Sequence, residues 1–231
     1  MNEILFIGFF IFLCALILGA LRCGKFYLFV LIAIFSISMN IFVTKQFEIF
    51  GILVTGGNAI YGAIFLSTDI LSEYFSHRDA LKSVTVGFFA LIFFAIATQI
   101  LIFFEPAEFD TAQNSIKNLF SPLPRILFGS FLAFFIAQIC DIFLFHKIKK
   151  ITKKKFLFVR NNFSTAISQF LDTLIFTAVG LTNFAFLPLP GVIEPQNFWP
   201  IFWATYLIKI LVAAIDTPFL YLAKNFLPEK N

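Results

Sequence analysis

Seven long apolar runs divide the chain, and polar or charged residues gather in the short connections between them. The runs cover residues 3–21, 26–43, 51–72, 84–104, 126–146, 164–183 and 199–223. Each has about the 20 residues that a helix needs to cross the ~30 Å hydrocarbon core of a bilayer. None shows the alternation of apolar and polar positions typical of membrane β-barrels. The pattern predicts an all-α, polytopic membrane helix bundle of about seven transmembrane helices, forming a single transmembrane domain over residues 1–231.

Composition strengthens this prediction. The chain is 60% hydrophobic, contains 37 Phe and is only 13% charged, a balance that excludes an ordinary soluble domain. The first run carries Glu3 and no basic residue before its apolar part, and Arg22 stands where a signal peptidase would need a small residue. We therefore expect the first run to be a retained span rather than a cleaved signal peptide.

Basic residues concentrate in alternate connections. Residues 147–155 hold six Lys, and the connections on the same predicted side contain Arg22, Lys25, Arg78, Lys82 and Lys224. The other connections carry Glu48, Glu105, Glu108, Asp110 and Glu194. The positive-inside rule then places the N-terminus outside and the C-terminus inside. We interpret the Lys-rich loop as a contact with anionic lipid headgroups at the cytoplasmic face, not with nucleic acid.

The chain offers little material for metal binding or covalent catalysis. Its scattered cysteines and histidines, Cys14, Cys23, Cys140, His77 and His146, lack metal-ligand spacing. No nucleophile–base pair or phosphate-binding loop is recognisable, so we expect no cofactor, no metal and no enzymatic activity.

A short polar pattern recurs inside two of the apolar runs. Gln138 precedes Asp141, and Gln169 precedes Asp172, by three residues, so each amide shares a helix face with its carboxylate. A carboxylate at membrane depth costs ~2.5–3.5 kcal/mol even on the insertion scale. Two such pairs therefore predict a functional polar site.

The predicted topology places the carboxylates of four spans in one layer toward the cytoplasm. That layer contains Asp69, Asp141, Asp172 and Asp216, with Lys209 as the basic residue near it. Our candidate substrate-binding residues are Asp69, Gln138, Asp141, Gln169, Asp172, Lys209 and Asn58. Two structural alternatives stay open: one or two carboxylates simply pair with Lys209, or Asp216 caps a helix broken before Thr217-Pro218.

Two further segments carry local predictions. Thr55-Gly56-Gly57-Asn58 interrupts the third run, which indicates either a broken helix lining a site or close helix packing. On the face of a third helix, Asn58, Gly62, Phe65, Asp69 and Glu73 recur at spacings of three and four. In the connection 105–125, we expect a short interfacial helix from Asp110 to Phe120.

Three segments together resemble the queuosine precursor transporter family, also called the vitamin uptake transporter family. They are Phe65 to Glu73 with Arg78 and Ala80, Ser130 to Phe145, and Ser164 to Phe176; Lys209 also looks like the family pattern. The resemblance covers residues 50–223 and implies a six-helix core, to which the first span looks like an addition. Ser76 departs from the family pattern, where a Gly often follows the Asp–Glu motif.

The resemblance implies an importer of 7-deazaguanine precursors of the tRNA base queuosine, in the cell inner (cytoplasmic) membrane, without ATP-driven partners. A guanine-like edge has adjacent N–H donors that a carboxylate can accept, and a carbonyl that a Gln amide can serve. The alternative is a substrate-binding membrane subunit of an energy-coupling vitamin importer. The residues leave open which precursor is carried, the coupling ion and whether the protein is a homo-oligomer.

Overall fold

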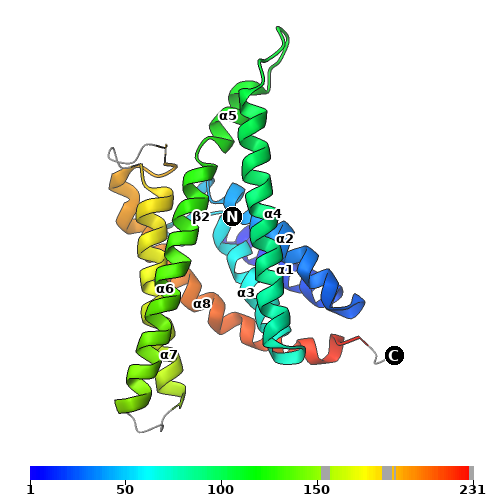
Figure 1. Ribbon diagram of the computed structural model, residues 1–231, viewed down its shortest axis with the longest axis vertical. Helices are drawn as coiled ribbons and strands as arrows, with labels where there is room; N and C mark the ends of the chain where they lie inside the picture. Colours follow the sequence, from blue (N-terminus) through cyan, green and yellow to red (C-terminus); the bar gives the residue numbers. More distant parts are fainter. Residues whose placement is uncertain (152–156, 184–188, 190, 229–231) are drawn as a thin grey trace. The chain divides into compact units, whose positions relative to one another are not determined.

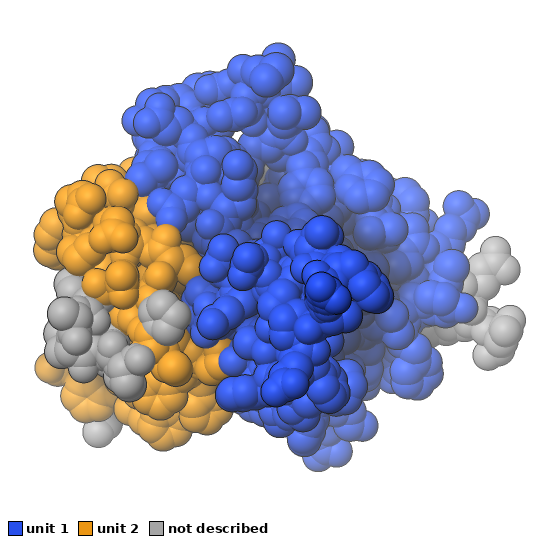
Figure 2. All heavy atoms as spheres, turned by 90° about the horizontal axis from the view of Figure 1, so that it is seen from above, with its two compact units in different colours: residues 1–123, 211–231 blue, residues 124–210 orange. Residues whose placement is uncertain are grey.

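The computed structural model describes residues 1–151, 157–183, 189 and 191–228, leaving out the side chains at 77, 138, 141, 142, 145, 146, 148–150, 157–165 and 212–217. The chain groups into two units: residues 1–123 with 211–231, and residues 124–210 (Figure 2). Each unit is described by itself below. The prediction of one transmembrane domain stays a prediction.

The first unit is built on four long helices. These are α1 (Asn2–Cys23), α2 (Lys25–Phe42), α3 (Gly57–Tyr74) and α4 (His77–Phe103), with the short α5 (Gln113–Phe120) against α4 (Figure 1). Helix α2 packs against α3 and α4, and α1 packs against α2 and α3. The 3₁₀ turn Lys224–Phe226, after the end of α8, also contacts α1. The predicted short helix in 105–125 is confirmed as α5.

Glycines set the spacing of these helices. A Cβ added at Gly87 of α4 would lie 2.6 Å from Ser36 Oγ of α2. At the start of α3, a Cβ at Gly56 or Gly57 would lie 2.8 Å from Phe42 O or 2.9 Å from Met39 O. The paired glycines thus mark both the beginning of α3 and its close packing on the end of α2, as small residues do between membrane helices.

A β-hairpin replaces the first part of the predicted third span. Strands β1 (Gln46–Ile49) and β2 (Ile52–Thr55) pair antiparallel, with Ile49 opposite Ile52. The two turn residues, Phe50 and Gly51, both have positive φ, 50° and 71°, the pattern of a type I′ turn. The prediction of helix from residue 51 is therefore wrong, because alternating β-branched and aromatic residues around a turn glycine favour a hairpin.

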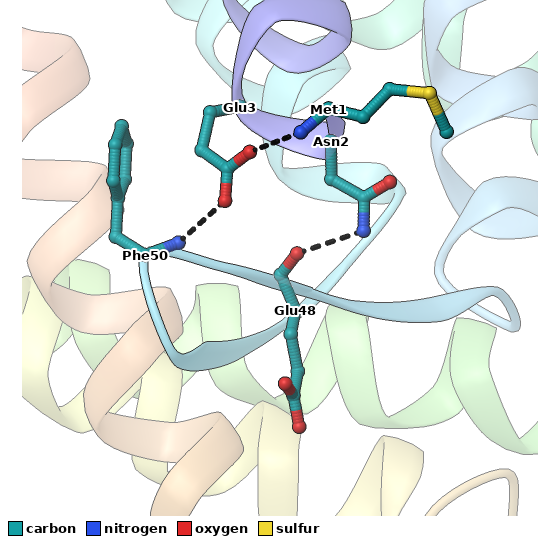
Figure 3. A network of polar contacts seen from close by, with 5 residues as sticks. All are labelled: Met1, Asn2, Glu3, Glu48 and Phe50. Atoms are coloured by element: carbon teal, nitrogen blue, oxygen red, sulfur yellow. Dashed lines mark hydrogen bonds and ion pairs between the residues drawn. The ribbon is translucent and has the colours of Figure 1, made fainter.

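The hairpin is tied to the beginning of α1 by two hydrogen bonds, and an ion pair within the N-terminal segment adds to them (Figure 3). Glu3 accepts the Phe50 N–H at 3.2 Å and pairs with the Met1 ammonium at 2.8 Å. The Asn2 amide donates to Glu48 O at 2.9 Å. With Cys14, Ile17 and Leu21 buried on its inner face, α1 is an integral part of the first unit.

The second unit contains α6 (Leu123–Ile151), α7 (Leu157–Ile175) and the first part of α8 (Phe198–Ala223), preceded by the 3₁₀ turn Pro195–Asn197. Helix α7 continues as a π-helical segment, Phe176–Leu181, whose wider turn is closed by Thr182 N–H donating to Thr177 O. Gly129 of α6 lies against Gly180 of this segment. Helix α8 is continuous through Pro218, so the helix break considered before Thr217 is absent.

Membrane-spanning character is evident in the described residues. Four helices are long and apolar enough to cross a bilayer: Asn2–Cys23, Lys25–Phe42, Arg78–Phe103 and Gln113–Ala137, with Ala166–Leu181 as a shorter apolar helix. Helix α4 exposes Phe89, Phe93 and Ile96 in one stripe, and Phe93 is 73% exposed. Such a stripe suits contact with lipid tails. The all-α polytopic class is confirmed, and the number seven stays a prediction.

Candidate functional site

An ion pair joins two of the predicted site residues. Lys209 Nζ of α8 lies 2.5 Å from Asp172 Oδ2 of α7. The Lys209 side chain is 7% exposed and the Asp172 side chain 16%. Burying either the ammonium or the carboxylate alone would be costly in free energy, and the ion pair offsets that cost. Of the two structural alternatives left open by the sequence, the structure therefore contains the first, a direct pair of Lys209 with a carboxylate, that of Asp172.

The pair uses one half of the Asp172 carboxylate. Among the described residues, Lys209 is the side-chain partner of Asp172, and it occupies Oδ2. A carboxylate has about four lone-pair positions on its two oxygens. Oδ1 therefore keeps its capacity to accept a hydrogen bond from a ligand.

An aromatic cluster holds α7 and α8 together beside this pair. Phe170 meets Phe202 and Tyr206 edge to face, with ring centroids 5.1 and 5.6 Å apart. The Tyr206 hydroxyl donates to Ala166 O at 3.3 Å. Because Phe170 is two residues before Asp172 and Tyr206 three before Lys209, this cluster fixes the register in which the two charges meet.

Sequence reasoning missed this cluster. The Trp203 ring also belongs to it and contacts Phe170, with centroids 6.1 Å apart. The signal was present: residues 199, 202, 203 and 206 are aromatic and recur at helical spacing.

The other candidate residues of the second unit are less fully described. Gln169 lies one turn before Asp172 on α7, and its carbonyl accepts the Thr173 hydroxyl at 2.8 Å. Gln138 and Asp141 lie in α6, but their side chains are outside the described residues. Their participation in the site stays a prediction.

The two candidates on α3 differ in their surroundings. Asn58 is buried at the start of the helix, where its Oδ1 accepts from Thr55 Oγ1 at 3.5 Å; its amide nitrogen has no hydrogen-bond partner in the described part of the chain. Asp69 is exposed, about 16 Å farther along the helix. The predicted face from Asn58 to Glu73 therefore divides, with Asn58 and Gly62 buried and Phe65, Asp69 and Glu73 exposed. Residues spaced by three and four positions shift gradually around the helix axis, so these five residues do not all lie on one buried face.

Arg125 is a buried charged residue that the sequence did not single out. It is 3% exposed, and its guanidinium donates to Val179 O at 2.9 Å, to Leu189 O at 2.6 Å and to Thr182 O. Val179 lies in the π-helical segment and Thr182 directly follows it, whereas Leu189 lies farther along the connection to α8. Arg125 thus supplies donors to carbonyls that the end of α7 leaves without helical partners. The available signal was an Arg directly before the apolar run 126–146, in a predicted outer connection that carries more acidic than basic residues.

Replacing Arg125 by Met is expected to destabilise the protein by about 2 kcal/mol, because three carbonyls lose their donor while most of the aliphatic part of the side chain is kept. The measurement is thermal unfolding of the detergent-solubilised protein. The matched control, Lys117→Met, removes an exposed basic residue of α5 and should change stability by less than about 0.5 kcal/mol. Equal stability of the two variants would contradict the role given to Arg125.

A groove on the first unit lies apart from these residues. It has a volume of about 680 Å³ and is lined mainly by apolar side chains of α1, the end of α2 and the hairpin, including Phe6, Phe9 and Phe47. Lys45 is the charged residue in its lining, and none of the seven predicted site residues contributes to it. Its chemistry suits an apolar occupant and gives a flat polar base few partners.

Comparison with known families decides the assignment. The model of a family described as "Putative vitamin uptake transporter" matches residues 55–223, close to the extent of the resemblance noted in the sequence. The chain belongs to the vitamin uptake transporter family. All seven predicted site residues lie within the matched region of this family member, whereas α1, α2 and β1 precede it.

Two relatives of this vitamin uptake transporter have the same description. The "Probable queuosine precursor transporter" of Bacillus subtilis (strain 168) is 41% identical over 207 residues, covering 89% of this chain and 86% of the relative. The one of Haemophilus influenzae (strain ATCC 51907 / DSM 11121 / KW20 / Rd) is 23% identical over 181 residues, covering 78% and 72%. No solved structure matches the chain. Neither name describes a subunit of an energy-coupling importer, and that alternative is not favoured.

Proposed function

We propose that the protein imports queuosine precursors for tRNA modification. The observation that carries the proposal is the 41% identity to a Bacillus subtilis protein named as a probable queuosine precursor transporter, over 86% of that protein's length. The substrates are 7-deazaguanine bases: 7-cyano-7-deazaguanine, its aminomethyl form or queuine. The protein moves its substrate unchanged, with no catalytic step.

The chemistry of Asp172 supports this substrate class. A 7-deazaguanine base presents a ring N–H and an exocyclic amino group side by side, next to a ring carbonyl. A carboxylate with an unused oxygen, buried beside a lysine, can accept such donors through charge-assisted hydrogen bonds. Gln169, one turn away on α7, has an amide that can serve the carbonyl.

The remaining candidates belong to the proposal on sequence grounds. Asp141 and Gln138 repeat the pattern of Asp172 and Gln169 on α6. Asp69 and Asn58 lie on α3, within the region that matches the family. We propose that these residues take part in binding the base, with Asp69 and Asp141 at the predicted depth of Asp172 and Asn58 nearer the outer side.

The test is restoration of queuosine in a host that can neither make nor import its precursors. Cells expressing the protein receive limiting amounts of one radiolabelled base at a time, and queuosine in tRNA is measured with and without a proton uncoupler. We expect at least one base to restore queuosine. Failure with every precursor, with the protein present in the membrane, would refute the function. The uncoupler separates proton-linked from facilitated import.

Localisation and topology complete the proposal. We place this multi-pass protein in the cell inner membrane, with the N-terminus outside and the Lys-rich loop near anionic headgroups of the cytoplasmic leaflet. A homo-oligomer is compatible with this arrangement.

A cysteine placed at Lys153 is expected to be protected from an impermeant thiol reagent added to intact cells. The background is free of Cys14, Cys23 and Cys140. A cysteine at Glu108, in the predicted outer connection, is the matched control and should react readily, since Glu108 is exposed. Reaction at 153 from outside, with no reaction at 108, would invert the topology.

A further inference from the structure

The position of Lys209 has a consequence for substrate binding. The Lys209 ammonium occupies Asp172 Oδ2, and among the described residues Lys209 is the one side-chain partner of this carboxylate. On the proposed function, on which this inference rests, the substrate brings two adjacent N–H donors. Two adjacent donors fit a carboxylate best when each oxygen accepts one. Lys209 therefore lies where the second donor must go.

We propose that Lys209 competes with the substrate for Asp172 and is a specificity-determining residue of this transporter. A ligand with one donor can use Oδ1 and leaves Lys209 in place. A ligand with two adjacent donors displaces the ammonium from Oδ2. The ring carbonyl beside the ligand's N–H then accepts a hydrogen bond from the displaced ammonium, so both buried charges keep partners throughout.

The chemical nature of lysine suits this exchange. Its ammonium is a compact charge on a flexible stem with three donors, so it can move from one acceptor to a neighbouring one. An arginine would instead present a rigid fork that fits both carboxylate oxygens at once. The surrounding cluster of Phe170, Phe202 and Tyr206 keeps α7 and α8 in register while the side chain moves.

Because Lys209 competes with the base for Asp172, it also takes part in the release of the base. When the base leaves, the ammonium returns to Oδ2 and replaces the donors that are lost. A buried carboxylate without a partner is costly in free energy. The returning lysine removes this cost once the base has left. A transporter needs both steps, because binding that is too tight would slow each cycle.

The experiment measures equilibrium binding of radiolabelled 7-cyano-7-deazaguanine to purified protein in lipid nanodiscs, together with uptake in proteoliposomes. Lys209→Met keeps the length of the side chain and removes the competing charge. We expect roughly tenfold tighter binding and slower turnover, because the ion pair that the base must displace is stronger than the ammonium–carbonyl hydrogen bond that replaces it. Lys209→Arg should bind the base roughly tenfold more weakly, because the guanidinium fork occupies both oxygens.

A second probe isolates the donor count. The matching 7-deazahypoxanthine, which lacks the exocyclic amino group, offers a single donor on this edge. Its affinity should be the same within about twofold for the unmutated protein and Lys209→Met, because it never requires Oδ2. Tightening of both ligands alike would contradict competition at that oxygen.

The two variants separate competition from a structural role. If the pair only stabilises the fold, Lys209→Arg will bind like the unmutated protein and Lys209→Met will bind more weakly, which overturns the proposal. Lys209→Arg decides alone if Lys209→Met cannot be recovered from the membrane. If the unmutated protein binds no precursor, the proposed function fails and this inference fails with it.

Discussion

Replacing Asp172 by Asn is expected to weaken the apparent affinity for the imported base by roughly 30–150-fold. The change keeps the size of the side chain but turns one acceptor into a donor, which then faces a donor of the ligand. Loss of a charge-assisted hydrogen bond together with an unpaired group costs ~2–3 kcal/mol. Asp172→Asn also removes the carboxylate that pairs with the Lys209 ammonium. The loss of this pair lowers both binding and stability.

The assay is queuosine formation in the deficient host at limiting external base and equal protein level. The matched control is Asp79→Asn, which removes another carboxylate that pairs with a lysine, Lys25, at 3.2 Å in the first unit. That variant should retain uptake within about threefold, because Asp79 lies outside the proposed site. A double variant, Asp172→Asn with Lys209→Met, also removes the charge that Asp172 balanced, and it should recover protein level without recovering uptake. Uptake by Asp172→Asn equal to that of the unmutated protein would remove Asp172 from the site.

Gly129→Val is expected to destabilise the protein by about 3 kcal/mol, or to prevent its accumulation. A Cβ at Gly129 would lie 2.5 Å from the backbone nitrogen of Gly180 and closer still to its Cα. The obstructing atoms belong to the backbone of the π-helical segment, so they cannot rotate away as a side chain would. Forcing larger groups into a packed interface commonly costs 1–3 kcal/mol, and backbone collisions lie at the upper end.

The comparison is Gly19→Val on α1, where no atom lies within 4 Å of an added Cβ. We expect that variant to unfold thermally within a few degrees of the unmutated protein. Fluorescence-detected size exclusion after heating would measure both. If Gly129→Val proved as stable as Gly19→Val, α6 would not approach the π-helical segment as closely as described.

The helices were largely predictable because the apolar runs are long and their connections are polar. Residues 84–104, for example, lie within α4 but for the last, and 199–223 lie within α8. The hairpin was not predictable in this way. Residues 46–55 are mostly apolar, as the membrane helices are. The alternation of side chains typical of a strand lasts only four residues on each side of the turn.

The candidate site was predictable in chemistry and only partly in geometry. The count of buried charges led to Lys209 as the partner of a carboxylate, and the structure pairs it with Asp172. Which face of a helix is buried was harder to predict, as Asn58 and Asp69 illustrate. In a membrane protein, lipid-facing and core-facing positions are both apolar, so periodicity carries less information than it does in water. Arg125 was missed for a related reason: its acceptors are backbone carbonyls, which leave no pattern in the side chains.

The π-helical segment has a consequence for the evolution of this family. A π turn holds one residue more than the α turn it replaces, and it commonly arises when a single residue is inserted into a helix. Each residue of an α-helix turns the chain by about 100°. In a relative that lacks the inserted residue, the backbone carbonyls would point at Arg125 in different directions, unless a change near Thr182 compensates for the missing residue. Alignments of this family should therefore place their one-residue gaps between Phe176 and Leu181 more often than elsewhere in the second unit.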